Sequence, residues 1–271
     1  MRKYKFTEGT KGILRDGRKI TLHRICAERD FGDVKKGEQG GWIETEDNLS
    51  HSGDAWVFGN ARVSGNARVF GNAQVLGDAQ VSGNAWVFGV VRVFGDAQVF
   101  EDACVSGNAW VFGDVRVSGN VHVFENAQVF GDARVSENAW VLGNAQVSGD
   151  ARVFENAQVF GDARVFGNAQ VFGNARVSGN AWIFRTRHVF TAGPIGSRDD
   201  FVTFFRDKGG GISVKCGCFF GKLGKFLEEA RKAYGDSKYA HEYTLAAENA
   251  KACIDLAEDC QEPPYAVGAE T

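Results

Sequence analysis

The chain has 271 residues, of which 44% are hydrophobic and 24% are charged, with 35 Gly and 22 Phe but only 3 Pro. This length and apolar content exclude a disordered tail and allow one large or two modest domains. High glycine without proline excludes a collagen-like chain or a low-complexity linker. The formal charge of -3 offers no bulk field for nucleic acid or an anionic membrane.

The N-terminal stretch 1–19 is basic but is not followed by the apolar run of a signal peptide, and no later stretch has the length and apolarity of a membrane span. We therefore expect a cytoplasmic protein with no membrane partner. Six cysteines are too few for a disulfide framework in a chain of this length, so free thiols are expected.

Residues 1–48 are predicted to form a small N-terminal β cap. Asp16-Gly17 is a hairpin turn signal between two apolar runs. A glycine-rich stretch over 32–41 leads to Trp42-Ile43, where we expect the first coil of the next domain to begin.

From Ala55 to Thr186 the chain consists of 22 consecutive hexads without an insertion. The first position is Ala in 19 units and the third is Val in 21. On an extended strand these two positions point to the same side, so they are predicted to face a core. Gly fills the fifth position in 17 units and Asn or Asp the sixth in 20, as expected of a sharp corner with left-handed backbone angles.

Identical short strands and turns predict a coil of three hexads, whose strands stack in parallel at about 4.8 Å. The array, extended to residues 49–190, therefore predicts a mainly β fold: a parallel β-helix of about seven or more triangular coils. Each coil is covered by its two neighbours, so the first and last coils leave the apolar interior open. The rod therefore needs a cap at each end.

Hexads such as VFGNAR and VFGDAQ resemble the bacterial hexapeptide-repeat family, whose fold is a left-handed parallel β-helix. The handedness is what the resemblance implies. The segment FGDVKKGEQGGWIETEDNLS is similar to the corresponding part of YdcK-like proteins of enterobacteria and phages, which are often labelled transferases. This sequence departs from the transferase pattern in carrying Phe or Ser after the aliphatic position.

Outward-facing aromatic residues recur at every third hexad and are therefore predicted to stack along one face of the rod. Such a strip exceeds the apolar surface that soluble monomers usually expose, so we expect a cover. The cover could be the flanking domains folding back, a face-to-face dimer or trimer, a protein partner or a ligand. The candidate binding residues are Trp56, Phe58, Phe94, Trp110, Phe112, Phe130, Phe166, Trp182 and Phe184.

A second face combines serine and phenylalanine with arginine, an arrangement that could stack single-stranded nucleic acid. The arginines are Arg62, Arg116, Arg134 and Arg152. Because acidic residues outnumber arginines in the array, the sequence disfavours a nucleic-acid partner.

An acyltransferase of this fold class would need a histidine base beside a pocket. The only histidine of the array is His122, which is predicted to stack on Cys104, giving a possible nucleophile and base. We favour the simpler interpretation that these are two surface residues at the most variable position of the repeat, so no catalytic residue is assigned and the pair is a weak candidate. A zinc site of three coil histidines is excluded, and His51 and His188 flank the array as capping residues.

Residues 191–260 are predicted to form an α+β module of three strands and two helices, followed by a disordered tail over 261–271. The helices are expected at about 222–234 and 238–258 from their apolar spacing. Cys216 and Cys218 are weak metal candidates, since two thiols on one strand facing a sheet-helix core explain the spacing without metal.

These observations lead to a non-catalytic β-helix scaffold, phage- or prophage-encoded, that uses an exposed aromatic face for self-association or for a protein partner, without a cofactor. One alternative is an acyltransferase that uses acetyl-CoA in a cleft between subunits. A second alternative is single-stranded nucleic-acid binding along the aromatic ladder.

Overall fold

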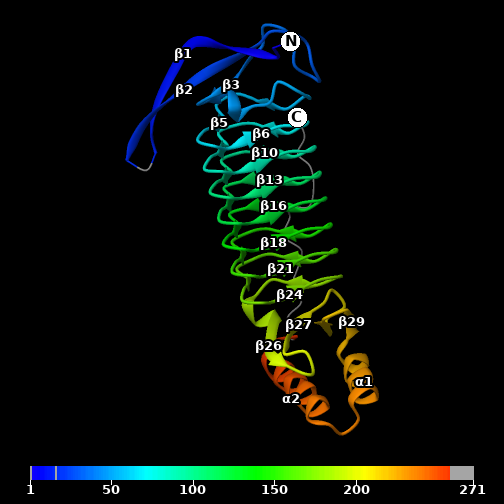
Figure 1. The fold of residues 1–271 in the computed structure, drawn as a ribbon. Helices are drawn as coiled ribbons and strands as arrows, with labels where there is room; N and C mark the ends of the chain where they lie inside the picture. Colours follow the sequence, from blue (N-terminus) through cyan, green and yellow to red (C-terminus); the bar gives the residue numbers. More distant parts are fainter. Residues whose placement is uncertain (1, 16, 257–271) are drawn as a thin grey trace.

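The computed structural model describes residues 2–15 and 17–256. The hexads form a long parallel β-solenoid, with a β hairpin and loops at its N-terminal end and an α+β module at its C-terminal end (Figure 1). Three sheets run along the solenoid and define about eight coils, which confirms the predicted fold class.

The ten-stranded sheet begins with the N-terminal strands β1 (Tyr4–Arg15), β2 (Arg18–Ala27) and β3 (Gln39–Ile43). Its solenoid strands are β5 (Arg62–Val63), β8 (Gln80–Val81), β11 (Gln98–Val99), β14 (Arg116–Val117), β17 (Arg134–Val135), β20 (Arg152–Val153) and β23 (Gln170–Val171).

The other two solenoid sheets contain eight and seven strands. The eight-stranded sheet contains β4 (Trp56–Val57), β7 (Gln74–Val75), β10 (Arg92–Phe94), β13 (Trp110–Gly113), β16 (Gln128–Gly131), β19 (Gln146–Val147), β22 (Arg164–Val165) and β25 (Trp182–Ile183). The seven-stranded sheet contains β6 (Arg68–Val69), β9 (Trp86–Val87), β12 (Cys104–Val105), β15 (His122–Val123), β18 (Trp140–Val141), β21 (Gln158–Val159) and β24 (Arg176–Val177).

The solenoid interior consists of the first and third residues of each hexad, as the pattern predicted. Their side chains, from Ala55 to Ile183, are at most 1% exposed. Small Ala and medium Val alternate along the chain, so neighbouring coils pack without large voids. Coils are joined by parallel ladder bonds such as that from Arg62 N–H to Ala79 O at 2.9 Å.

The corners hold left-handed backbone at the fifth hexad position. Gly83 has φ +73°, and a Cβ there would lie 2.5 Å from the backbone nitrogen of Glu101 in the next coil. Four corners keep this conformation without glycine: Glu101, Glu125, Glu137 and Glu155 have φ between 59° and 64°. Asparagine side chains at the sixth position add ladders between coils, as from Asn108 Nδ2 to Asn126 Oδ1 at 3.1 Å.

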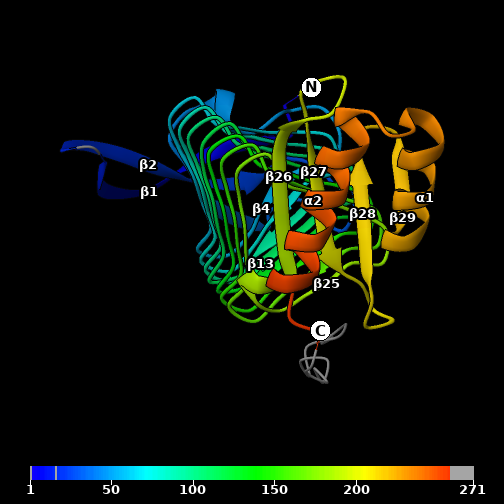
Figure 2. The same cartoon turned by 90° about the horizontal axis from the view of Figure 1, so that it is seen from below.

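The N-terminal cap covers the first coil and also contains a hairpin that extends away from the rod. Strands β1 and β2 form a hairpin that projects sideways from the rod in both views (Figures 1 and 2). Strand β3 joins the solenoid by parallel pairing of Trp42 with Arg62, as expected for the start of the coils. The turn 44–50 contains the 3-10 helix η1 (Glu46–Asn48).

The open N-terminal end of the core is sealed by buried polar and aromatic side chains. Lys3 is fully buried, and its Nζ donates a hydrogen bond to Ala55 O at 2.8 Å. Burial is the main reason that the pKa of Lys3 is lowered to about 8. Tyr4 stacks on His51 with ring centroids 4.3 Å apart, and both Tyr4 and Phe31 contact Trp56 edge to face.

The C-terminal module closes the other end. After the 3-10 helix η2 (Thr186–His188) come the antiparallel strands β26 (Val189–Ile195), β27 (Asp200–Arg206), β28 (Ile212–Cys216) and β29 (Phe219–Lys222), and the helices α1 (Leu223–Tyr234) and α2 (Lys238–Cys253). The sheet therefore has four strands, and the predicted count of three is wrong. The second helix ends at Cys253, earlier than the predicted 258, and residues 254–256 are not helical. The predicted tail 261–271 lies outside the described residues.

This four-stranded sheet lies between the last coil and the two helices (Figure 2). Phe205 belongs to the solenoid core, whereas Phe204, on the opposite side of β27, packs with Phe226 under the helices. Two bonds tie the sheet to the last coils: Arg176 N–H donates to Thr203 Oγ1 at 2.8 Å, and Lys208 N–H donates to Asn180 O at 3.0 Å. The module therefore caps the end of the rod, and its side chains also reach outward residues of the last coils, as Lys215 does over the ring of Phe160 at 5.9 Å.

Candidate functional site

The eight-stranded sheet carries the aromatic column that the sequence predicted. Phe94 and Phe112 stack with parallel rings 4.7 Å apart, and Phe112 and Phe130 stack at 5.0 Å. The guanidinium of Arg92 lies 5.4 Å from the ring of Trp110. Because these rings cover one another, Phe94, Trp110 and Phe112 are each only partly exposed.

The expected exposure of this strip is wrong at several positions. Trp56 is fully buried under the N-terminal cap. At the other end Phe166, Trp182 and Phe184 form a buried cluster, and Arg206 and Lys208 of the module lie over Phe184 and Trp182. Phe130 is 8% exposed. The part of the predicted strip that solvent reaches is therefore Phe58, Phe94, Trp110 and Phe112.

The most exposed tryptophans lie on the seven-stranded sheet instead. Trp86 is 48% exposed and Trp140 is 40% exposed. Each makes an edge-to-face contact with a phenylalanine of its own sheet at 6.0 Å, Trp86 with Phe70 and Trp140 with Phe124. The sequence places both tryptophans at outward hexad positions, but phenylalanine is more frequent on the eight-stranded sheet, and the predicted binding residues therefore came from that sheet.

Between these two tryptophans the outward residues of the seven-stranded sheet include no Lys, Arg, Asp or Glu. Its second and fourth hexad positions from β9 to β18 are Trp86, Phe88, Cys104, Ser106, His122, Phe124, Trp140 and Leu142. We call these eight residues the tryptophan strip.

The ten-stranded sheet carries the arginines of the predicted nucleic-acid face. Arg116, Arg134 and Arg152 are exposed and are register partners on successive coils. Beside the solenoid strands of this sheet, Phe154 and Phe172 stack at 5.3 Å. The adjoining corner carries an exposed aspartate on each of five successive coils: Asp78, Asp96, Asp114, Asp132 and Asp150. This negative column offsets the arginines, so the face lacks a continuous basic groove.

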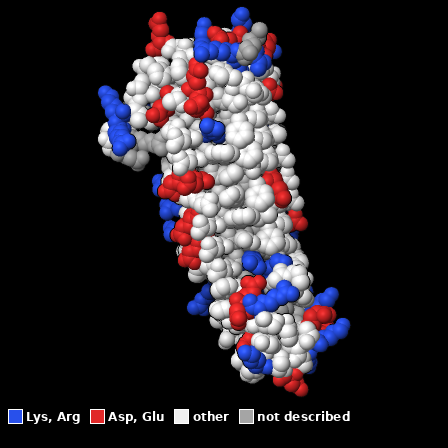
Figure 3. Space-filling model, viewed as in Figure 1, with Lys and Arg blue, Asp and Glu red and all other residues white. Residues whose placement is uncertain are grey.

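Acidic and basic side chains are distributed unevenly along the rod. In the space-filling view acidic side chains gather along the margins of the rod, while basic side chains are frequent at its two ends (Figure 3). No group of three or more potential metal ligands occurs among residues 2–15 and 17–256.

Cys104 and His122 are brought together as expected, since they are register partners on β12 and β15. The geometry is poor for a nucleophile and base. Burial raises the pKa of the Cys104 thiol, which disfavours the reactive thiolate. The rings of His122 and Trp140 lie 5.0 Å apart and are tilted by 34°. The buried Nδ1 of His122 has no hydrogen-bond partner among the described residues, so no carboxylate holds the ring through this atom.

Cys216 and Cys218 do not share a strand face, and that part of the prediction is wrong. Gly217, with φ +53°, makes the turn between β28 and β29. Cys216 is half-buried, whereas Cys218 is exposed. The turn interrupts the strand that the sequence predicted as continuous, because glycine in this conformation reverses the chain.

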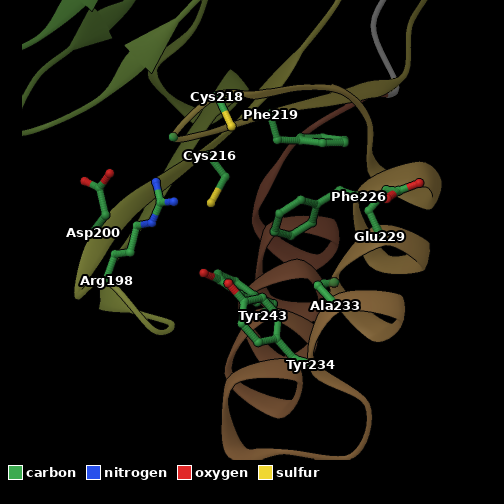
Figure 4. A pocket seen from close by; sticks show the side chains of 12 residues that line it. Arg198, Asp200, Cys216, Cys218, Phe219, Phe226, Glu229, Ala233, Tyr234 and Tyr243 are labelled. Carbon is green, nitrogen blue, oxygen red and sulfur yellow. The ribbon is translucent and has the colours of Figure 1, made fainter.

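These two cysteines border a cavity of about 280 Å³ that the sequence did not predict. Its walls come from the turn 196–199, the β28–β29 turn and helices α1 and α2 (Figure 4). Burial is the main cause of the raised pKa of both Cys216 and Tyr243, whose side chains are hydrogen-bonded to each other. Both groups are therefore neutral at physiological pH.

The histidines that flank the array lie in the caps. His188 is 1% exposed, and its Nδ1 accepts a hydrogen bond from Phe184 N–H at 3.3 Å. Burial, followed by the charges of Arg206 and Arg185, lowers the pKa of His188 to about 4. It is a neutral structural acceptor rather than a general base.

No helix among the described residues is both long and apolar enough to cross a membrane. The rod contains no extruded loop to frame a cofactor site, since its 22 hexads follow one another without insertion.

A family model described as the YdcK β-solenoid repeat matches residues 61–77, 127–143, 145–159, 157–171 and 169–185. A protein of Escherichia coli (strain K12) named "Uncharacterized acetyltransferase YdcK" is 39% identical over 62 residues. That match spans 21% of this chain and only 19% of the relative.

Among solved structures, a Bacillus cereus protein named as a candidate acetyltransferase aligns with 78% of this chain and 96% of its own. The identity is 8% and the TM-score is 0.23, which is too low to indicate a shared fold or function. The repeat matches, the relative and the observed coils agree on the fold. The chain is a hexapeptide-repeat β-solenoid, and its repeats are similar to those of the YdcK family model and of the E. coli relative.

Proposed function

We propose that this protein is a β-helix scaffold that associates with a second copy of itself through the tryptophan strip. The observation that carries the proposal is the exposure of Trp86 and Trp140 on a part of the sheet without Lys, Arg, Asp or Glu. Large aromatic side chains are enriched in the cores of protein interfaces, and Trp is among the residues that most often contribute a large share of the binding energy.

The spacing of the two tryptophans favours a second copy over an unrelated partner. Trp86 on β9 and Trp140 on β18 are separated by the strands β12 and β15 of the same sheet, and each contacts a phenylalanine in the same way. A two-fold axis between them would place Trp86 of one copy near Trp140 of the other, so the strip is complementary to itself in an antiparallel pair.

Light scattering coupled to size exclusion tests this proposal. The wild type should be a dimer, and Trp86→Gln combined with Trp140→Gln should be a monomer with an unchanged circular dichroism spectrum. Phe172→Gln is the matched control, because Phe172 is 46% exposed on another sheet. A monomeric wild type, or loss of the dimer in the control as well, would overturn the proposal.

An acyl-CoA-dependent transferase is the second candidate, and the name of the E. coli relative is what favours it. Under this proposal acetyl-CoA would bind between subunits, with His122 as the base. Isothermal titration with acetyl-CoA is the direct test. Binding that His122→Gln weakens, together with transfer to an amine acceptor, would replace the scaffold proposal.

A further inference from the structure

The cavity in the C-terminal module has the form of a small-molecule site, and it is separate from the tryptophan strip. Aromatic side chains bound it on three sides (Figure 4). Phe219 contacts Phe226 at 5.4 Å between ring centroids, and Phe226 contacts Tyr243 at 5.5 Å. Tyr234 extends this wall, 5.8 Å from Tyr243. Ala230 and Ala233 of α1 complete the lining, and their small side chains leave the space between the rings open.

The remaining side of the cavity is a turn that is fastened to both helices. Gly196 packs directly against the hydroxyl of Tyr243, and its N–H donates to Glu242 Oε2 at 2.7 Å. One residue further on, Ser197 Oγ and the hydroxyl of Tyr234 share a hydrogen bond of 3.0 Å. The turn that carries Arg198 is therefore held in place before any ligand arrives, and preorganisation of this kind favours binding.

The charges around the cavity leave Arg198 available. Arg198 is exposed, lines the cavity and has no ion pair with any residue in 2–15 or 17–256. Its neighbour Asp200 forms an ion pair with Arg176 at 3.6 Å, so the aspartate charge is largely compensated. Glu229 lies on the far side, with its carboxylate turned away from the cavity (Figure 4).

We propose that this cavity binds a small planar molecule of one or two aromatic rings that carries one carboxylate, with the rings against Phe219, Phe226 and Tyr243 and the carboxylate on Arg198. The volume of about 280 Å³ is near the lower limit of ligand sites, which restricts the ligand to this size. Aromatic walls take a flat apolar body. The planar guanidinium matches a carboxylate with two parallel hydrogen bonds.

Saturation-transfer NMR and isothermal titration on the full chain test this proposal with matched pairs of probes. The probes are benzoate, phenylacetate and indole-3-acetate, each compared with its uncharged primary amide. At least one acid should bind with a dissociation constant below about 1 mM. Its amide should bind at least about tenfold more weakly, because the charge-assisted bond to Arg198 is lost.

Two variants test whether the ligand contacts Arg198 and whether it occupies the cavity. Arg198→Gln should weaken binding of the acid at least about tenfold and leave the amide unaffected. Ala233→Trp should abolish binding of both, because the indole fills the cavity. The control is Arg231→Gln, which removes an exposed arginine of α1 outside the cavity. Absence of binding by all three acids, equal binding of acids and amides, or equal effects of the Arg198 and Arg231 variants would each overturn the proposal.

Discussion

Cys104 and His122 are paired across neighbouring coils, yet the imidazole packs against Trp140 and its Nδ1 has no partner within residues 2–15 and 17–256. The most reactive-looking pair in the rod is thus part of an apolar surface. The raised pKa of Cys104 has burial as its main cause, and this favours the neutral thiol.

We therefore expect Cys104 to react slowly with iodoacetamide at pH 7.5. Peptide mass spectrometry over time should show alkylation of exposed Cys218 well before that of Cys104. The variant His122→Gln should leave the rate at Cys104 unchanged. Faster alkylation of Cys104 than of Cys218, with slowing by His122→Gln, would instead indicate an activated thiolate and favour the transferase candidate.

The glutamates at four corners should be destabilising in their backbone conformation. Glu101 has φ +61°, a region that costs a residue with a Cβ roughly 1–2 kcal/mol. Replacement of Glu101 by Gly removes this cost but adds chain entropy to the unfolded state, so the free energy of unfolding should rise by about 0.5–1 kcal/mol. Urea denaturation followed by fluorescence measures the change.

The matched substitution is Gly83→Glu in the preceding coil. Here the new Cβ would lie 2.5 Å from the backbone nitrogen of Glu101, so this variant should lose stability by more than Glu101→Gly gains. Equal and opposite changes would show that only the φ angle matters. A loss of stability in Glu101→Gly would show that the glutamate side chain itself contributes to the corner.

His188 should make the solenoid cap sensitive to acid. Its pKa is about 4 in the folded chain and 6.5 in the unfolded chain, so the unfolded state binds more protons between these values. Stability from this group is fully present above pH 6.5 and is lost as the pH falls toward 4. A shift of this size corresponds to roughly 3 kcal/mol.

The variant His188→Asn keeps an acceptor for Phe184 N–H and cannot be protonated in this range. Its unfolding free energy should depend less on pH between 6.5 and 4 than that of the wild type. Parallel curves for the two proteins would mean that other groups govern the acid transition.

Lys3 should act in the opposite pH range. Its pKa is about 8 in the folded chain against 10.5 in the unfolded chain, so the unfolded state again binds more protons in between. The contribution of Lys3 to stability is therefore lowest below pH 8 and rises toward pH 10.5. Thermal unfolding of the wild type and of Lys3→Met at pH 7 and pH 10 checks this, and the difference between the two proteins should change in favour of the wild type at pH 10.

Sequence alone determined the solenoid because every hexad repeats the same local choices. Ala and Val at positions two apart fix which side is buried, and glycine at the corner fixes where the chain turns. No distant contact is needed to interpret such a pattern, so the sheets, the interior and the outward columns follow from the repeat of three hexads per coil. The stacked pair Phe94 and Phe112 was predictable for this reason.

The tertiary structure alone decided which aromatic residues solvent can reach. Trp56 and Trp182 occupy the same hexad position as Trp86, yet both are buried because the two caps lie over them. The position of a cap depends on non-repeating contacts such as that between Ala181 and Asp207, which have no period in the sequence. The same holds for the cavity beside Arg198, because it unites a turn, a strand end and two helices that only the folded module brings together.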